Sequence, residues 1–343
     1  MKTKLIHLTV LALSLSLAQQ LRAQGGSLTP PPGAPAPVMR TLDEIYNKTA
    51  AVETQVTTQA PQITTIETKV GQLQNRTPVN TLPGNASATH VISLPGHYYL
   101  TGGITGTSTK SGIRVDAANV TIDLNGFPLE AVAGCTKGIE IYSAGPILIR
   151  NGSLRWWPQQ AIWSSGNAEI TVQDMMIQDT QHRAIDVSGN AIIERVTVKT
   201  AQHAGIYCNG VQPSIIRDCR VEGITSTGFS MGIRATKSII SRCTVSNVSG
   251  TSAANNANES IYGIWSDGGS VQSCIVNIIT QSGAADSMGI YSHQVLDCTV
   301  VGVSNSGPED SIGIQAEVLS RCSVSLISST NSSVGIRWAD TVE

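Results

Sequence analysis

Apolar residues recur every seven positions between Leu42 and Leu73. One set of positions holds Leu42, Thr49, Val56, Ile63 and Val70, and the other holds Ile45, Val52, Gln59, Ile66 and Leu73. Eight of these ten residues are apolar, whereas the residues between them are mostly Thr, Gln, Glu and Lys. The pattern predicts an α-helical coiled-coil stalk over residues 41–75, and its β-branched seam favours a homotrimer.

Pro61 lies inside this segment, so we expect it to kink or interrupt the helix. A second interpretation is a single amphipathic helix that lies on the main domain. The Thr-rich outer positions are poor helix formers, which favours stabilisation by partner chains.

From about residue 88 the pattern changes to a small residue followed by Ile. The Ile positions are Ile113, Ile139, Ile162, Ile185, Ile206, Ile233, Ile264, Ile290, Ile314 and Ile336. They lie 21 to 31 positions apart. A second β-rich segment recurs between them, and its reference positions are Gly126, Gly152, Met175, Val196, Cys219, Cys243, Cys274, Cys298 and Cys322.

Two strand-like segments per roughly 23 residues define one turn of a solenoid, whose apolar side is buried only when turns stack. The frame of leucine-rich repeats and the six-residue period of left-handed β-helices are both absent. The sequence therefore predicts an all-β, right-handed parallel β-helix of about ten turns over residues 108–343. Residues 76–107 are expected to form its N-terminal cap.

Five of the seven cysteines occupy one equivalent position of the repeat, so we expect an interior column of reduced thiols. Neighbouring Cα atoms about 4.8 Å apart would also be within disulfide range. Stacked side chains point the same way, however, which favours reduced packing. A single row cannot supply the tetrahedral ligands of zinc.

The first 23 residues are typical of a signal peptide. Lys2 and Lys4 precede an apolar stretch from Leu5 to Leu17, and Ala23 offers a small residue at the cut. A Pro/Gly-rich linker is expected over residues 24–40. The protein is therefore predicted to be secreted or held at the cell surface, without a membrane span. The chain stops at Glu343 where another strand is due, so we expect a β-helix truncated at its C-terminal end.

The segments ISLPGHYYLTGGI, GIRVDAANVTIDLNGFPL and ILIRNGSL resemble the opening turns of pectin-lyase-like right-handed β-helix proteins. Together with the signal peptide, the Pro-rich linker and the TLDEIYNKT segment, the chain is similar to exported bacterial β-helix repeat proteins of unassigned activity. The resemblance covers almost the whole chain and implies the fold. It implies little about activity, because this scaffold serves lyases, hydrolases, adhesins and tailspikes.

Composition and missing motifs narrow the function. Charged residues make up 13% of the chain and its formal charge is −2, so a nucleic-acid partner is not expected. The Asn-Thr-Asp, Asp-Asp and Gly-His-Gly segments of polygalacturonases are absent. The Trp-Ile-Asp-His segment and acidic calcium cluster of pectate lyases are absent too.

The candidate catalytic residues are His182, Arg183, Asp186 and His203, because an acid, a base and a cation would gather on neighbouring turns. Glu140 and Asp186 are equivalent positions two turns apart, roughly 9–10 Å, near the upper limit for an inverting carboxylate pair. The alternative interpretation is the polar outer face of a sheet.

The residue after each motif Ile should point outward and form a surface column. This column holds four aromatic residues, which are candidate sugar-binding residues together with the nearby Trp156 and Trp157: Trp163, Tyr207, Trp265 and Tyr291. Loops or a partner chain could cover these rings instead.

Glu259, Asp286 and Asp310 precede the motif in successive turns and are candidate calcium ligands, with solvated loop acids as the alternative. The Asn-rich loop Gly250–Ser260 is a candidate lip of a binding site. Three functions follow from these patterns: a non-catalytic module that binds a glycan or another surface, a polysaccharide lyase or glycoside hydrolase of uncommon type, and an architectural spacer.

Overall fold

The structure is a computed structural model that describes residues 42–74, 76–166, 168–210, 212–251, 260–337 and 341–342. The chain divides into two units, residues 1–70 and 71–343. The predicted signal peptide and linker lie outside the described residues and stay predictions.

The predicted stalk segment forms one helix, α2 (Leu42–Gln74), which continues through Pro61. Pro61 therefore does not interrupt the helix, and the alternative expectation of a kink stays a prediction. Val52, Val56 and Ile63 of the predicted seam are each more than half exposed in the single chain. The coiled coil and the homotrimer stay predictions. No helix among the described residues has the length and apolar character needed to cross a membrane.

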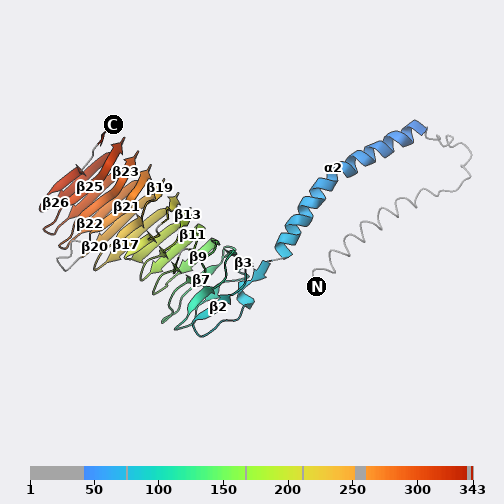
Figure 1. Cartoon of the computed structure of the whole chain (residues 1–343), viewed down its shortest axis with the longest axis horizontal. Coiled ribbons are helices and arrows are strands. Elements are labelled where there is room, and N and C mark those ends of the chain that lie inside the picture. Colours follow the sequence, from blue (N-terminus) through green and yellow to red (C-terminus); the bar gives the residue numbers. More distant parts are fainter. Residues whose placement is uncertain are drawn as a thin grey trace, which may run out of the picture. The chain divides into compact units, whose positions relative to one another are not determined.

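The second unit is a parallel β-solenoid in which successive turns lie side by side (Figure 1). Each turn contributes strands to three sheets, which are numbered in the order in which a turn passes through them from its Gly-Ile strand onward. The first sheet contains β2 (Ala88–Ile92), β5 (Ser111–Val115), β8 (Ile139–Ile141), β10 (Ile162–Ser164), β12 (Ile185–Val187), β15 (Ala204–Cys208), β18 (Met231–Ala235), β21 (Ile261–Gln272), β23 (Ser287–Leu296), β25 (Ser311–Ser320) and β27 (Ser333–Arg337).

The second sheet contains β1 (Arg76–Pro78), β3 (Gly96–Tyr99), β6 (Val120–Asp123), β9 (Ile147–Arg155), β11 (Ile170–Thr180), β13 (Ala191–Glu194), β16 (Ile215–Arg217), β19 (Ile239–Ser241) and β28 (Thr341–Val342). The third contains β4 (Ile104–Thr105), β7 (Pro128–Glu130), β14 (Thr197–Gln202), β17 (Arg220–Ser226), β20 (Thr244–Gly250), β22 (Ile275–Gln281), β24 (Thr299–Asn305) and β26 (Ser323–Ser329). Long strands bend from one sheet into the next: β9 and β11 also join the third sheet, and β21, β23 and β25 also join the second.

The ten motif isoleucines form one continuous ladder. Each pairs in register with the next, from Ile113 opposite Ile139 to Ile314 opposite Ile336. The first nine side chains are fully buried. The predicted solenoid of about ten turns is therefore confirmed, and its core is built from columns of like residues.

The small residue before each Ile is explained by a close approach across the core. A Cβ added at Gly232 would lie 2.2 Å from a methyl carbon of Val245, and one at Gly263 would lie 2.4 Å from a methyl carbon of Val276. These valines come from the third sheet, two residues after a column cysteine. The third-sheet valines thus fill the space that a larger first-sheet residue would need.

Two columns of residues with positive φ bend the chain. One lies at the corner between the second and third sheets and holds Asn125, Asn151, Asp174, Arg195, Asp218, Arg242, Ser273, Asp297 and Arg321. The other bends the third-sheet strands and holds Trp156, Asp179, Thr200, Gly223, Asn247, Ile278, Gly302 and Leu326. Asn and Gly suit this conformation, whereas β-branched Ile278 at φ +58° does not.

The five predicted column cysteines stack in the interior and, like Cys135 and Cys208, are free thiols. The Cys274 Sγ atom accepts the backbone N–H of Cys243 at 3.4 Å, and the Cys298 Sγ atom accepts the backbone N–H of Cys274 at 3.4 Å. Burial raises the pKa of the Cys208 thiol to about 12. The predicted reduced packing column is therefore confirmed.

Residues 76–107 do more than cap the stack. Strands β2, β3 and β4 pair in parallel with β5, β6 and β7, and His90 lies opposite Ile113. These strands complete a turn of their own that lacks the Gly-Ile motif. Beside it, Val79 of the short 3₁₀ helix η1 (Val79–Thr81) is fully buried.

Replacing Ile278 with Asn should stabilise the solenoid. Ile278 is about half exposed, so little burial is lost, while the left-handed backbone costs a β-branched residue about 1 kcal/mol. We expect Ile278→Asn to raise the urea midpoint of unfolding. Ile275→Asn is the matched control, since Ile275 is an exposed residue of the same strand without positive φ. Equal destabilisation by both substitutions would contradict this account.

Thiol labelling tests the cysteine column. Six of the seven cysteines are buried and Cys322 is partly exposed. A thiol-specific reagent should therefore modify Cys322 first and the others only after denaturation, because the reagent cannot reach buried thiols. Mass spectrometry counts the modified sites. Rapid labelling of Cys243 or Cys274 in the native protein would show that the column is not closed.

Candidate functional site

The predicted alignment of the residues that follow each motif Ile is confirmed, although Glu140, Asp186 and Tyr207 are buried rather than exposed. The aligned residues pair in register through ten turns: Arg114, Glu140, Trp163, Asp186, Tyr207, Arg234, Trp265, Tyr291, Gln315 and Arg337. We call this set the first-sheet column. It combines four aromatic rings with cations and carboxylates on neighbouring turns.

Most rings of the first-sheet column already face a cation or another ring. The Lys137 ammonium lies 4.1 Å from the centroid of the Trp163 ring. Arg183 and Arg234 lie 3.8 and 4.8 Å from the Tyr207 centroid. Such contacts stabilise a surface by about 0.5–2 kcal/mol each and occupy the ring faces that a sugar would stack on.

The structure corrects two of the six predicted sugar-binding aromatics. Trp157 is fully buried and its Nε1 donates to the Leu129 carbonyl oxygen at 3.2 Å, so it is a core residue. Tyr207 is 7% exposed and packs with Met231 in a small cluster. Trp265 and Tyr291 stack on each other with centroids 6.0 Å apart. Trp156 is 51% exposed, because its left-handed backbone turns the side chain outward.

The four candidate catalytic residues do come together. The His182 and His203 rings lie 4.9 Å apart, and the Arg183 guanidinium donates to Asp186 Oδ2 at 3.0 Å. Gln160 donates to the same carboxylate oxygen at 3.3 Å. The acid of the cluster is therefore already paired with a cation and an amide.

The two imidazoles are held in their neutral form. Burial, His203 and Arg183 lower the pKa of His182, and burial and Arg183 lower the pKa of His203. Neither Nδ1 atom has a hydrogen-bond partner among the described residues. Asp186 acts in the opposite direction on His182, but burial is the larger effect.

The second carboxylate of the predicted pair is also compensated. Glu140 Oε1 accepts from Lys137 Nζ at 2.7 Å and from the Tyr142 hydroxyl at 2.9 Å. Both Glu140 and Asp186 are buried. Neither residue therefore offers an unpaired carboxylate to a glycosidic bond placed between the two.

The calcium candidates gain no support. Glu259 lies outside the described residues. Asp310 Oδ1 accepts from Asn331 and Oδ2 from Arg337, and Asp286 Oδ1 accepts the backbone N–H of Asp310. Within the described ranges, no group of three or more His, Cys, Asp or Glu residues could hold a metal ion.

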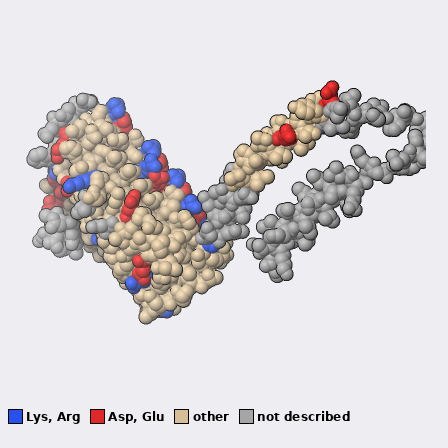
Figure 2. All heavy atoms as spheres, turned by 45° about the vertical axis from the view of Figure 1, so that its right-hand side comes forward, with Lys and Arg blue, Asp and Glu red and all other residues tan. Residues whose placement is uncertain are grey.

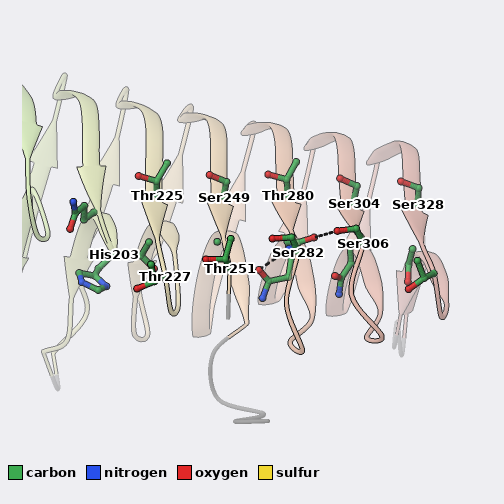
Figure 3. Close-up of a pocket in the computed structure, with 17 residues that line it drawn as sticks. His203, Thr225, Thr227, Ser249, Thr251, Thr280, Ser282, Ser304, Ser306 and Ser328 are labelled. Atoms are coloured by element: carbon green, nitrogen blue, oxygen red, sulfur yellow. Dashed lines mark hydrogen bonds between the residues drawn. The ribbon is translucent and has the colours of Figure 1, made fainter. Parts of the chain in front are cut away.

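A groove of about 810 Å³ runs along the C-terminal ends of the third-sheet strands (Figure 3). Its described lining has seventeen residues, all Ser, Thr, Gln, Asn or Gly except His203. None of these seventeen is Asp, Glu, Lys or Arg. Gly250 and Thr251, at the start of the predicted lip, belong to the lining, and residues 252–259 lie outside the described residues.

Two rows of hydroxyl groups form the floor of the groove, as Figure 3 shows. The first row is Thr225, Ser249, Thr280, Ser304 and Ser328, which pair in register. The second row follows two residues later in each turn and is Thr227, Thr251, Ser282, Ser306 and Thr330.

These rows were not predicted from the sequence, although a signal was present. A hydroxyl residue stands six and again eight positions after each of the five column cysteines. The signal is visible only once the cysteines fix the phase of the repeat.

A smaller hollow of about 250 Å³ continues the groove toward earlier turns. It shares Gln202 and Thr225 with the groove, and its lining includes Trp156, Thr180 and Asp179. The exposed Trp156 ring, which the sequence analysis selected, thus lies beside the groove rather than in the first-sheet column.

The charged side chains outside the groove are largely paired. At the corner between the second and third sheets, Arg195 donates to Asp174 at 2.6 Å and Arg242 donates to Asp218 at 2.7 Å. Figure 2 shows blue and red side chains in close proximity along the β-helix, while most of the visible face is uncharged. The groove is therefore an uncharged polar surface on a weakly charged molecule.

Acid should destabilise the protein through His182 and His203. Their folded pKa values are lowered, so the unfolded chain binds protons first as the pH falls below about 6.5. This stabilising contribution is fully present above that pH and is lost as the pH falls through the folded values. We expect His182→Gln/His203→Gln to flatten the decrease in unfolding free energy between about pH 7 and pH 5. The exposed His97→Gln is the control, and an unchanged slope in the double variant would contradict the assignment.

The solved structures to which this chain is similar are distant. A search of curated proteins finds no match. The catalytic unit of an α-1,3-glucanase from Streptomyces thermodiastaticus strain HF3-3 has 13% identity and a TM-score of 0.23, and covers 75% of this chain. The A-module of the mannuronan C-5 epimerase AlgE4 from Azotobacter vinelandii has 11% identity and a TM-score of 0.19, with coverage of 73% of this chain and 89% of that one.

The chain spans 65% of the glucanase unit. The family model of the right-handed β-helix region matches residues 103–307, which is more than half of the chain. This match covers the first-sheet column from Arg114 to Tyr291 and the groove lining from Gln202 to Ser306. The chain therefore belongs to the family of right-handed β-helix proteins.

Proposed function

We propose that this protein is an exported or cell-surface module that binds a glycan along its β-helix without catalysis. The observation that carries the proposal is the groove over the third sheet, with its lining of uncharged hydrogen-bonding side chains. Hydroxyl and amide groups both donate and accept, as do the hydroxyl groups of sugars. A groove of several hundred Å³ is the size of a ligand site.

The electrostatics of the first sheet support binding over catalysis. A glycosidase needs one protonated and one ionised carboxyl group on either side of the scissile bond. Glu140 and Asp186 are instead each bound to a cation and a second donor. The predicted lyase or hydrolase activity remains the second candidate, because the His182, Arg183, Asp186 and His203 cluster is assembled.

One assay separates the two candidates. Purified protein is incubated with a panel of insoluble and soluble polysaccharides, both neutral and uronate-containing. We expect retention on at least one polysaccharide, with no new reducing ends and no unsaturated products. Products that form with the wild type and vanish with Asp186→Asn would overturn the non-catalytic proposal. Absence of retention on every polymer would overturn glycan binding itself.

A further inference from the structure

The groove has features that define its ligand more narrowly. We infer that it holds a linear, uncharged polysaccharide that runs along the axis of the solenoid, with Trp156 stacking on a sugar ring at one end. This inference rests on the proposed glycan binding and adds the ligand class, its direction and the residues that contact it.

The first row of hydroxyl groups is free to bind a ligand. Within the described residues, none of these five Oγ atoms takes part in a side-chain hydrogen bond. Other Ser hydroxyls of the same region are used internally: Ser226 donates to the Phe229 carbonyl oxygen at 2.6 Å, and Ser230 donates to that of Ser249 at 2.7 Å. The first row is therefore unpaired throughout, whereas in the second row Ser306 and Thr330 donate to the carbonyl oxygens of Gln281 and Gly307.

Gln281 supplies a second and independent indication of a ligand. Gln281 is one of the lining residues, its side chain is 3% exposed, and its Oε1 accepts the backbone N–H of Ser282 at 3.2 Å. Its Nε2 has no hydrogen-bond partner among the described residues. One turn further, the equivalent Asn305 is fully used, since its amide donates to Ala285 and accepts from Gly307. An unpaired buried donor costs about 1–3 kcal/mol, which a ligand oxygen would offset.

The charge of the lining selects an uncharged polymer. A uronate or sulfate group that entered the groove would lose hydration without meeting a cationic side chain among the seventeen described lining residues. Neutral sugar hydroxyls lose less hydration free energy when they enter the groove. Each turn of the groove offers them a hydrogen-bond donor or acceptor. The discrimination against charged polymers therefore follows from the absence of Lys and Arg among the described lining residues.

The geometry fixes the direction of the polymer. Gln202 and the first row pair in register through six turns, whose five spacings of about 4.8 Å give a track of about 24 Å along the axis. The track opens into the hollow that contains Trp156. An exposed indole face next to a polar track suits a sugar ring, which has an apolar face and hydroxyl edges.

The test compares matched double substitutions on the third sheet. Thr225→Val/Thr280→Val removes two hydroxyls of the first row, and Thr197→Val/Thr244→Val removes two hydroxyls at the opposite end of equivalent strands. Isothermal titration is carried out with soluble xylan, glucomannan, β-glucan and polygalacturonate. We expect the groove variant to raise the Kd for a neutral polymer about tenfold, and the control variant to leave it within about twofold. Trp156→Ala should raise the Kd by a similar factor.

Oligosaccharides of increasing length test the axial direction. Affinity should rise from disaccharide upward and level off when the ligand fills the track. Equal affinity for the shortest and longest neutral oligosaccharide would overturn the axial arrangement.

The outcomes also separate this inference from the proposed function. Binding of polygalacturonate alone, or binding that survives Thr225→Val/Thr280→Val but is lost in Trp163→Ala/Trp265→Ala, would overturn the groove assignment while glycan binding stands. Binding of none of the four polymers would overturn the groove assignment together with its ligand class.

Discussion

The structure depends on the hydrogen bonding of each strand to the same residues of the next turn. Parallel strands satisfy their backbone groups only in register, and a slip of one residue would turn the apolar side chains outward. The ladder from Ile113 to Ile336 is the visible result of this constraint. Because every turn repeats the same register, each side chain belongs to a column, and surface chemistry is arranged in columns as well.

This constraint explains what the sequence could predict. The spacing of the Gly-Ile motif set the register, and the register placed the first-sheet column and the cysteine column correctly. The prediction was weakest where residues leave the repeat. Trp156 and Trp157 are adjacent, yet Trp156 is exposed and Trp157 is fully buried. Trp156 itself has the left-handed backbone that turns its side chain outward. The turn built from residues 76–107 was missed because it pairs in register without the motif.

The site was less predictable than the fold for a different reason. Acidic residues, histidines and aromatic rings are the usual candidates for a functional site in a sequence. In the structure, those of the first sheet mainly contact charged or aromatic neighbours. Arg183, for example, contacts both Asp186 and Tyr207. Ser and Thr are common polar residues and carry no such signal alone. Their two rows indicate a binding site only when they are seen to align across turns beside the amide of Gln281. The Nε2 atom of that amide is unpaired because of packing that the sequence cannot show.

His203 joins the two surfaces, because it stacks on His182 beside the first-sheet column and also lines the groove. Its imidazole is the titratable group among the described lining residues. Protonation would place a positive charge at one end of an otherwise uncharged track, close to the guanidinium of Arg183. The acidity of the surroundings therefore controls the electrostatic character of that end of the groove, and a polymer lying there would experience the change only in the segment beside His203.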